Sequence, residues 1–259
     1  MMLDETEATD GMQIRQRETG RLIITVREPT STQLEYIART SQLPYGVDKG
    51  SLSYVRFRDS PPPGWERRAA DLRGIEQWGM DLRGADLRGS DLRKARLQVV
   101  DLGAVVLAGA TLFGSEFICV TMCGANVRAA NMIQARLDGA RWSNTDLRSV
   151  RLTGSRFFFS RVHDCDMRDA DLTQAFVQGT SLRGTNLAGV TLDRTVFLDC
   201  HDLHEAVGLD AVRSGEGCAL DSTTLRESGT KLPTAFLRAV GFDDACIDAI
   251  RRGELWAPD

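Results

Sequence analysis

The sequence lacks any long apolar run. Its 259 residues are 42% hydrophobic and 26% charged, and no stretch reaches the roughly 18 consecutive apolar residues that a membrane-spanning helix needs. The first ten residues are acidic, without the basic and apolar segments that begin a secretory signal peptide. We therefore expect a cytoplasmic protein that does not associate with a membrane.

Residues suited to catalysis are also scarce. The chain has three histidines, and its glycines lie at turn-like positions rather than in a loop that would bind a phosphate. His163, Asp164 and Cys165 are consecutive, but neighbouring residues on an extended chain point in different directions. A reaction has to be argued from a site, and none is visible. The sequence therefore predicts a protein that is not an enzyme.

Metal and cofactor sites are not predicted either. A zinc site needs about four converging ligands. The nearest groupings are Cys119 with Cys123, and Cys200 with His201 and His204. Cysteines of a cytoplasmic chain are expected to be reduced and to pack as small side chains. We therefore expect no metal and no cofactor.

What the sequence does contain is a repeat of five residues. From Leu82 to Phe197 an apolar residue occupies every fifth position, without exception in 24 positions. The residue two positions earlier is usually small, as at Ala85, Ser90 and Ala95. A step of five fits neither the period of a helix nor that of a strand. The apolar residues can share one core only if the chain turns a corner every five residues.

Four such corners close a square, so one coil takes 20 residues. Residues 80–199 then make six coils, in a stack about 29 Å tall at about 4.8 Å per backbone ladder. Glycine often follows the apolar residue by two positions, as at Gly84, Gly89 and Gly109. Tight corners need a positive φ, which glycine adopts without strain. The small residues two positions before the central ones form a second inward column, which we call the small column. Small side chains are expected there because four large inward side chains already fill each coil.

Segments such as Ala85-Asp86-Leu87-Arg88-Gly89 and Ala170-Asp171-Leu172 resemble the repeat of the pentapeptide-repeat family. The resemblance implies an all-β solenoid, a right-handed quadrilateral β-helix of about six coils. It implies no single function, because members of that family do many different things. Some relatives protect DNA gyrase from quinolones or toxins by resembling duplex DNA.

Three parts are expected along the chain. Residues 1–69 form an irregular α/β extension and linker, with strand-like runs at Leu22–Val26 and Leu52–Phe57 and a helix at Gln33–Arg39. Residues 70–199 form the β-helix. Residues 200–259 form a small helical cap, with helices at about 203–212, 222–228 and 233–251, the last broken near Gly241. Ser222 is expected to cap the second helix and Gly229 to end it.

Two positions depart from the repeat. Trp142 stands where leucine or phenylalanine is usual, and a local bulge is expected there. Ala70-Asp71-Leu72-Arg73-Gly74 resembles a repeat, but the next central residue is Gln77. Either a degenerate first coil begins near residue 70, or Trp65–Trp78 is a capping helix with one apolar face.

The repeat also assigns the outward columns. Arg128, Arg148 and Arg168 share one column in consecutive coils, with Asn126, Asp146 and Asp166 two residues before them. This column either faces an anionic partner or forms a solvated ladder of ion pairs, each contributing little; the neighbouring carboxylates favour the ladder.

Another face is expected to carry a contiguous apolar patch, which marks an interface. Its candidate residues are Phe113, Ile118, Ile133, Phe158, Phe159, Phe176 and Leu198, together with Val99, Cys119 and Val196. Residues 1–60 or a second chain are the two candidates to cover it, and cover by the chain itself is favoured.

The favoured function is therefore a protein-interaction scaffold, with a partner protein or a second copy of the chain as its ligand. Protection of DNA gyrase is the alternative. A DNA mimic needs a strongly acidic surface, yet residues 80–199 hold 15 Lys and Arg against 13 Asp and Glu, and the excess of acid lies mainly in residues 200–259. Direct binding of nucleic acid is weaker still at this charge.

Overall fold

The computed structural model describes residues 12–15, 22–26, 72–74, 76–78 and 82–254. Strands β1 (Met12–Arg15) and β2 (Leu22–Val26) pair antiparallel, so the predicted strand at Leu22–Val26 is confirmed. The run at Leu52–Phe57 and the helix at Gln33–Arg39 lie outside the described residues. None of the helices within the described residues is long and apolar enough to cross a membrane.

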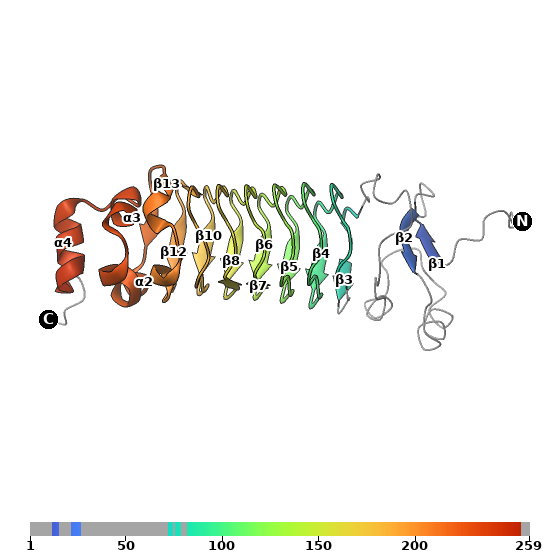
Figure 1. Ribbon diagram of the computed structural model, residues 1–259, viewed down its shortest axis with the longest axis horizontal. Helices are drawn as coiled ribbons and strands as arrows, with labels where there is room; N and C mark the ends of the chain where they lie inside the picture. Colours follow the sequence, from blue (N-terminus) through green and yellow to red (C-terminus); the bar gives the residue numbers. More distant parts are fainter. Residues whose placement is uncertain (1–11, 16–21, 27–71, 75, 79–81, 255–259) are drawn as a thin grey trace, which may run out of the picture.

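Residues 72–74, 76–78 and 82–220 wind into a right-handed β-helix of stacked coils, drawn from cyan to orange in Figure 1. One face is a parallel sheet of eight short strands, in the order β14-β12-β10-β8-β6-β5-β4-β3. Residues 20 apart are partners along this face, as in Arg96↔Glu116 and Phe176↔Val196. The predicted coil of 20 residues is therefore confirmed. The strands of this face are β3 (Glu76–Trp78), β4 (Arg96–Gln98), β5 (Glu116–Ile118), β6 (Arg136–Asp138), β8 (Arg156–Phe158), β10 (Phe176–Gln178), β12 (Val196–Leu198) and β14 (Ala219–Leu220).

The other faces are held mostly by single backbone bridges between neighbouring coils, for example Asn126↔Asp146 and Asp146↔Asp166. Two further strand pairs occur there. Strand β7 (Arg141–Ser143) pairs with β9 (Arg161–His163), and β11 (Thr191–Leu192) pairs with β13 (Arg213–Ser214). All the ladders within the β-helix are parallel, because each coil follows the path of the one before it.

All 24 central residues from Leu82 to Phe197 are buried in one continuous core. Trp142 is 1% exposed and pairs in regular register with Val162. The bulge predicted at Trp142 is therefore wrong. The stack admits the larger side chain because its neighbours in the column, Met122 and Val162, are smaller than the indole. Its Nε1 atom is left buried without a hydrogen-bond partner.

Every corner bends the backbone in the same way. The residue two positions after each of the 24 central residues has φ between +51° and +70°. Glycine adopts this conformation at ten of these corners, including Gly84, Gly89 and Gly109, as the sequence predicts. Fourteen other corners use residues with a side chain, including Val99 and Phe159, at a cost of about 1 kcal/mol or more each.

Hydrogen bonds close the corners by two routes. After Leu107 the N–H of Ala110 donates to the carbonyl of Leu107 at 2.9 Å. After Leu137 a side chain from the next coil takes over this role. Ser160 Oγ donates to the carbonyl of Leu137 and accepts from the N–H of Ala140 at 3.1 Å.

The same bridging occurs further along the stack. Thr180 Oγ1 donates to the carbonyl of Phe157 at 3.0 Å, and Thr185 Oγ1 donates to that of Val162 at 2.6 Å. The small inward column therefore supplies hydrogen bonds between coils as well as space in the core.

The β-helix begins before residue 80. Leu72 is buried, Gly74 has φ +63°, and β3 pairs in register with β4. A degenerate first coil is therefore present, and a capping helix reaching Trp78 is wrong, because residues 72–74 and 76–78 follow the corner and strand of a coil. The segment Trp65–Asp71 lies outside the described residues.

Beyond Cys200 the chain makes one more, wider coil rather than the helix predicted at 203–212. Bridging partners move from 20 residues apart to Asn186↔Val207, Thr191↔Arg213 and Val196↔Ala219. Short 3-10 turns, η2 (Leu203–Glu205) and η3 (Leu209–Ala211), take up the first added residues. Inward Leu203 and Leu209 remain buried, so the core pattern survives although its spacing does not.

Helices close this end of the stack, at the red end of Figure 1. They are α2 (Ser222–Ser228), the 3-10 turn η4 (Gly229–Lys231), α3 (Thr234–Ala239) and α4 (Asp244–Arg252). The predicted helix at 222–228 and the break near Gly241 are confirmed. The predicted cap at Ser222 is wrong by one residue: Asp221 caps α2, and its carboxylate accepts from the N–H of Thr224 at 2.8 Å.

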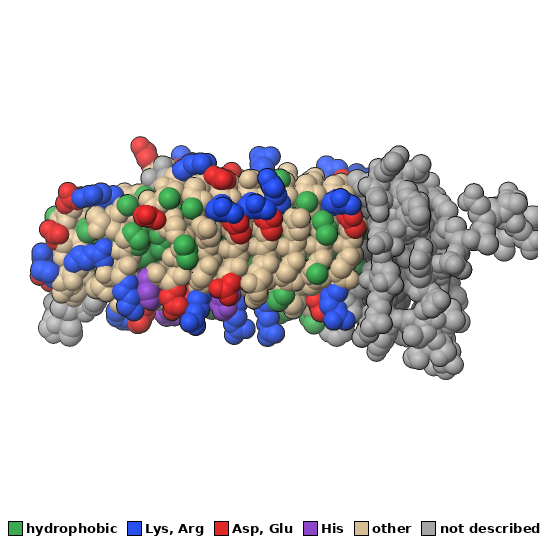
Figure 2. All heavy atoms as spheres, in the orientation of Figure 1, with side chains coloured by type: hydrophobic (Ala, Val, Ile, Leu, Met, Phe, Trp, Pro, Cys, Tyr) green, Lys and Arg blue, Asp and Glu red, His purple; other side chains and the backbone are tan. Residues whose placement is uncertain are grey.

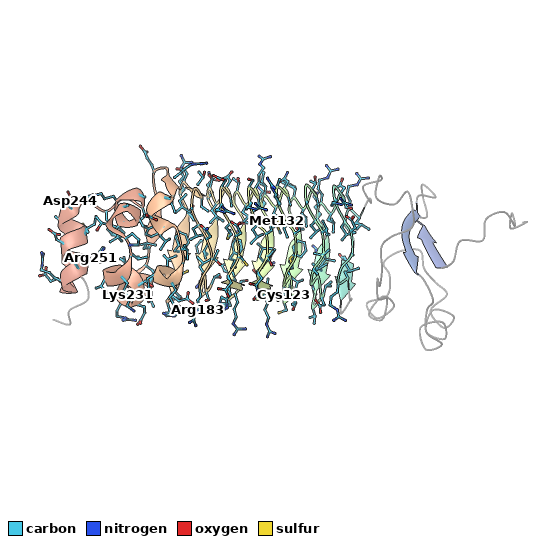
Figure 3. The ribbon with its side chains drawn as sticks, viewed as in Figure 1. Cys123, Met132, Arg183, Lys231, Asp244 and Arg251 are labelled. Atoms are coloured by element: carbon cyan, nitrogen blue, oxygen red, sulfur yellow. The ribbon has the colours of Figure 1, made fainter. Side chains whose placement is uncertain are left out.

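The cap packs on the shaft as part of the same core, through Leu225, Phe236 and Ile250. Arg251 of α4 holds the preceding turn, since its guanidinium donates to the carbonyls of Gly229 and Leu232 at 3.3 and 2.5 Å. Figure 3 labels Arg251 in this end of the molecule. A helical cap is one remedy for the open end of a stack, which would otherwise expose core and unpaired backbone.

Two serines of one coil test the bridging role of the small column. Ser160→Ala removes the bond to the carbonyl of Leu137, and we expect it to lower the free energy of unfolding by about 1–3 kcal/mol. Ser155→Ala is the matched control: Ser155 Oγ is buried without a partner, so its loss should be neutral or stabilising. Urea denaturation of both variants gives the comparison, and equal effects would refute the bridging role.

Candidate interaction surfaces

The predicted arginine column is a ladder of ion pairs. Arg148 donates to Asp146 through Nη2 at 2.6 Å, and its Nε lies 3.7 Å from Asp166 of the next coil. Arg168 donates to Asp166 at 2.7 Å. Figure 2 shows a row along the shaft in which Lys or Arg side chains lie beside Asp or Glu side chains. These arginines already have carboxylate partners.

The hydrogen bonds of the ladder hold the pKa of Asp146 and Asp166 below the ordinary value, because Arg148 and Arg168 donate to their ionised forms. Arg128 differs from the other two arginines. Its column neighbour is Asn126, whose side-chain oxygen accepts the Arg128 backbone N–H at 3.1 Å. Arg128 therefore remains an exposed cation at the end of the ladder.

The predicted apolar patch is interrupted. Ile118 lies opposite Asp138 in the next coil, and Leu198 lies opposite Gln178. These polar residues separate Ile118 from Phe158 and Phe158 from Leu198. The prediction of one contiguous patch is therefore wrong, because the outward positions of a strand are not all apolar across successive coils.

Two smaller apolar groups remain. Phe158 and Phe176 meet edge to face with ring centroids 5.6 Å apart, and Val196 lies beside Phe176 in the sheet. Phe113 and Ile133 follow one another in a column of the adjoining face, and both are half-buried. The large apolar side chains that the described residues expose most are Val99, Phe159 and Val207, at 51%, 70% and 54%. The predicted cover by residues 1–60 falls almost entirely outside the described residues.

The outward columns assigned from the sequence leave out four exposed arginines. Arg136, Arg141, Arg156 and Arg161 each begin a strand, β6 to β9, on two adjoining faces. A 20-residue step links Arg136 to Arg156 and Arg141 to Arg161. The same step that defined the other columns was the signal that could have found them.

His163, Ser181 and Asp202 are brought together by the stacking. His163 Nε2 lies 2.6 Å from Ser181 Oγ, and Ser181 also hydrogen-bonds the carboxylate of Asp202. A serine nucleophile of the triad type needs the carboxylate on the far side of the imidazole. Here the serine lies between the two other groups, and Asp202 accepts from the N–H of Leu182 as well. The arrangement ties the last coils together.

Cys165 and Cys200 occupy the inward small column, as predicted, and are 2% and 0% exposed. Burial raises the pKa of Cys165 to about 11 and that of Cys200 to about 12. Their thiols are therefore protonated near neutral pH and unsuited to nucleophilic attack. Cys123, labelled in Figure 3, lies on the surface instead. Within the described residues no group of three His, Cys, Asp or Glu side chains is placed to hold a metal ion.

The chain matches the family model for pentapeptide repeats, with 8 copies over residues 68–98, 128–158 and 164–197. Among solved structures, a trypsin-treated variant of QnrB1, a plasmid-mediated fluoroquinolone resistance protein, aligns with a TM-score of 0.54 at 19% identity. The alignment covers 61% of this chain and 80% of QnrB1. At this identity the likeness shows a shared fold and nothing about function.

HetL from the cyanobacterium Nostoc sp. strain PCC 7120, a pentapeptide repeat protein involved in heterocyst differentiation regulation, is 25% identical. That alignment covers 55% of this chain and 80% of HetL, with a TM-score of 0.18. No curated protein matches the sequence. The family model that matches is not one of a catalytic family.

The ion pairs of the arginine ladder predict that the melting temperature of the protein depends on pH in the acidic range. Because the folded-state pKa of Asp146 and Asp166 is lowered, their stabilising contribution is present above the ordinary aspartate pKa and is lost as pH falls through the folded value. Asp146→Asn/Asp166→Asn should therefore lower the melting temperature near pH 6 and flatten its decline between about pH 5 and pH 3. Parallel melting curves for variant and parent across this range would contradict the ladder.

The difference in burial between the cysteines predicts which of them react with an alkylating reagent. With iodoacetamide at about pH 7.5, the exposed Cys119 and Cys123 should be alkylated in the folded protein. Cys165 and Cys200 should be alkylated only after denaturation. Peptide mass spectrometry locates each modification. Labelling of Cys165 at the rate of Cys123 in the folded protein would show that its corner opens and would contradict the tight packing described above.

Proposed function

Because the chain belongs to the pentapeptide-repeat family and folds as its β-helix, we propose that it is a non-enzymatic scaffold that presents the faces of this β-helix to a partner protein. The observation that carries the proposal is the placement of Phe158, Phe159 and Phe176. They lie together on and beside strands β8 and β10, and Phe159 is 70% exposed. Exposed aromatic residues beside other apolar side chains are typical of protein interfaces.

The rigidity of the stack supports the same function. The inward side chains form one core that runs from Leu72 to Ile250, and backbone bonds link each coil to the next. Side chains on the outside are therefore held at fixed spacing before any partner arrives. Such preorganisation lowers the entropy that a binding surface loses on association.

Affinity purification tests the proposal. Tagged full-length protein is recovered from the native host after cross-linking, beside the variant Phe158→Ser/Phe176→Ser and the control Val207→Ser, which alters an exposed apolar residue in a different coil. We expect one or a few proteins to be enriched by the parent and the control, and at least about tenfold less by the double variant. Melting temperatures show that both variants are folded.

The proposal fails if the parent enriches nothing beyond the double variant and remains monomeric by light scattering. A dimer that dissociates in the double variant would identify a second copy of the chain as the partner.

Protection of DNA gyrase is the second candidate, and we rank it lower. Residues 80–199 hold 15 basic against 13 acidic side chains, whereas a mimic of DNA needs a strongly acidic surface. A supercoiling assay with purified gyrase and a quinolone separates the two candidates. Protection by micromolar protein would reverse this order.

A further inference from the structure

Positive charge is concentrated in a short part of the β-helix. Residues 136–161 contain six arginines and two aspartates, Asp138 and Asp146. The rest of residues 80–199 holds nine Lys and Arg against eleven Asp and Glu, by difference from the 15 and 13 of that span. The excess of positive charge in the shaft is therefore local.

Four of these arginines gather around one edge of the shaft. Arg136 and Arg156 are partners in the sheet of β6 and β8, and Arg141 and Arg161 are partners in the pair of β7 and β9. Partners in neighbouring coils lie about 4.8 Å apart along the stack. Arg136 and Arg141 belong to one coil and Arg156 and Arg161 to the next, and all four side chains are exposed. We call these four residues the arginine edge.

The arginine edge is poor in carboxylates. Asp138 is the one acidic residue in strands β6 to β9, and it is paired with Arg136. Within the described part of the chain, no ion pair engages Arg141, Arg156 or Arg161. The arginine ladder on the neighbouring face is built differently, since Arg148 and Arg168 each bond an aspartate two residues before them. Like charges held this close repel one another unless an anion lies between them.

Phe159 lies between Arg156 and Arg161, at the corner that joins their strands. It has φ +51° and is 70% exposed. Its column holds glycine in the coils on both sides, at Gly139 and Gly179, where φ is +63° and +58°. Glycine would adopt this conformation without strain and without exposing a ring to water. The folded state alone therefore favours glycine at position 159.

We propose that the arginine edge and Phe159 form a docking site for an acidic segment of a partner protein, with carboxylates on the arginines and an apolar side chain over Phe159. This rests on the proposed scaffold function and names the site and the chemistry of its partner. Charge complementarity selects the acidic residues. Phe159 supplies an apolar anchor beside the arginines. Aromatic residues and arginines are the residue types that contribute most binding energy at protein interfaces.

A protein segment fits this surface better than a nucleic acid. Next to Phe159 the surface continues through Phe158, Phe176 and Val196, none of them charged. A nucleic acid duplex presents its charged backbone outward and keeps its bases stacked inside, so it gains nothing from this apolar extension. A single strand, whose bases stack on exposed aromatic rings, is the alternative that the oligonucleotide comparison below tests. A protein segment can place acidic residues at the arginine edge and apolar residues beyond it.

The test uses a fluorescein-labelled twelve-residue peptide of alternating Glu and Leu as the probe. Its binding to full-length protein is followed by fluorescence anisotropy at low salt. The site variant is Arg156→Glu/Arg161→Glu. The control, Arg226→Glu/Arg238→Glu, changes the net charge by the same amount on α2 and α3 of the cap. We expect at least about tenfold weaker binding by the site variant and less than about twofold change in the control.

Phe159→Gly gives the second measurement. We expect about threefold or greater loss of peptide affinity together with an unchanged or higher melting temperature. A structural role for the ring would instead lower the melting temperature. Equal loss of binding in site and control variants would show attraction to net charge alone and would overturn the site. Unchanged binding by Phe159→Gly, or tighter binding of a twelve-nucleotide oligothymidylate than of the peptide, would also overturn it.

Failure of this site is distinguishable from failure of the scaffold function. If affinity purification enriches the same partner with Arg156→Glu/Arg161→Glu as with the parent, the scaffold function stands and the docking site is wrong. If the site variant loses that partner and the control keeps it, both stand.

Discussion

The structure depends on one backbone constraint: the chain turns the same corner every five residues, and each corner needs a residue with positive φ. Each face of the square is then only a few residues long, too short for stable pairing on its own. Stability comes from stacking, since the backbone groups of one coil are satisfied by the coils above and below. The inward side chains follow from the same constraint, because only the central residue and the small residue two positions before it can reach the axis.

The hydroxyl groups of the small column add a second layer of order. At several corners that lack their own backbone bond, a serine, threonine or cysteine from the next coil occupies the gap, as Ser160 does after Leu137. Thr224 does the same at the cap, accepting from the N–H of Cys200 at 3.0 Å. The first helix of the cap thus continues the bonding pattern of the coils, which explains how a helical segment can end a β-helix without leaving its last corner open.

Sequence reasoning was strongest where the period is strict and weakest where it changes. The repeat predicted the centres from Leu82 to Phe197 because one geometric rule fixes them all. It failed beyond Cys200, where added residues widen the last coil while Leu203 and Leu209 stay inside. It also failed at Trp142, because whether an indole fits depends on the packing of neighbouring side chains, which the repeat pattern does not describe.

The site was harder to predict than the fold. Apolar residues on one face suggested a continuous patch, but the patch depends on which residue stands opposite which, and Asp138 and Gln178 stand opposite Ile118 and Leu198. The arginine edge spans two faces across a corner, so it was missed when each face was considered separately. Whether a charge is free also depends on its neighbours, as the contrast between Arg148 and Arg156 shows.

The corner residues have a consequence for how the outer surface can vary. The ring of Phe159 leans over the next coil, so a Cβ added at Gly179 would come within 2.5 Å of Phe159 Cδ1. Asp164 and Gly184, and Asp169 and Gly189, stand in the same relation. At these three corners the outward side chain thus fills the space that a Cβ would need one full turn later, so replacing the glycine there also requires a change of its partner. At these corners the outer surface therefore varies through linked pairs of substitutions spaced by one whole turn.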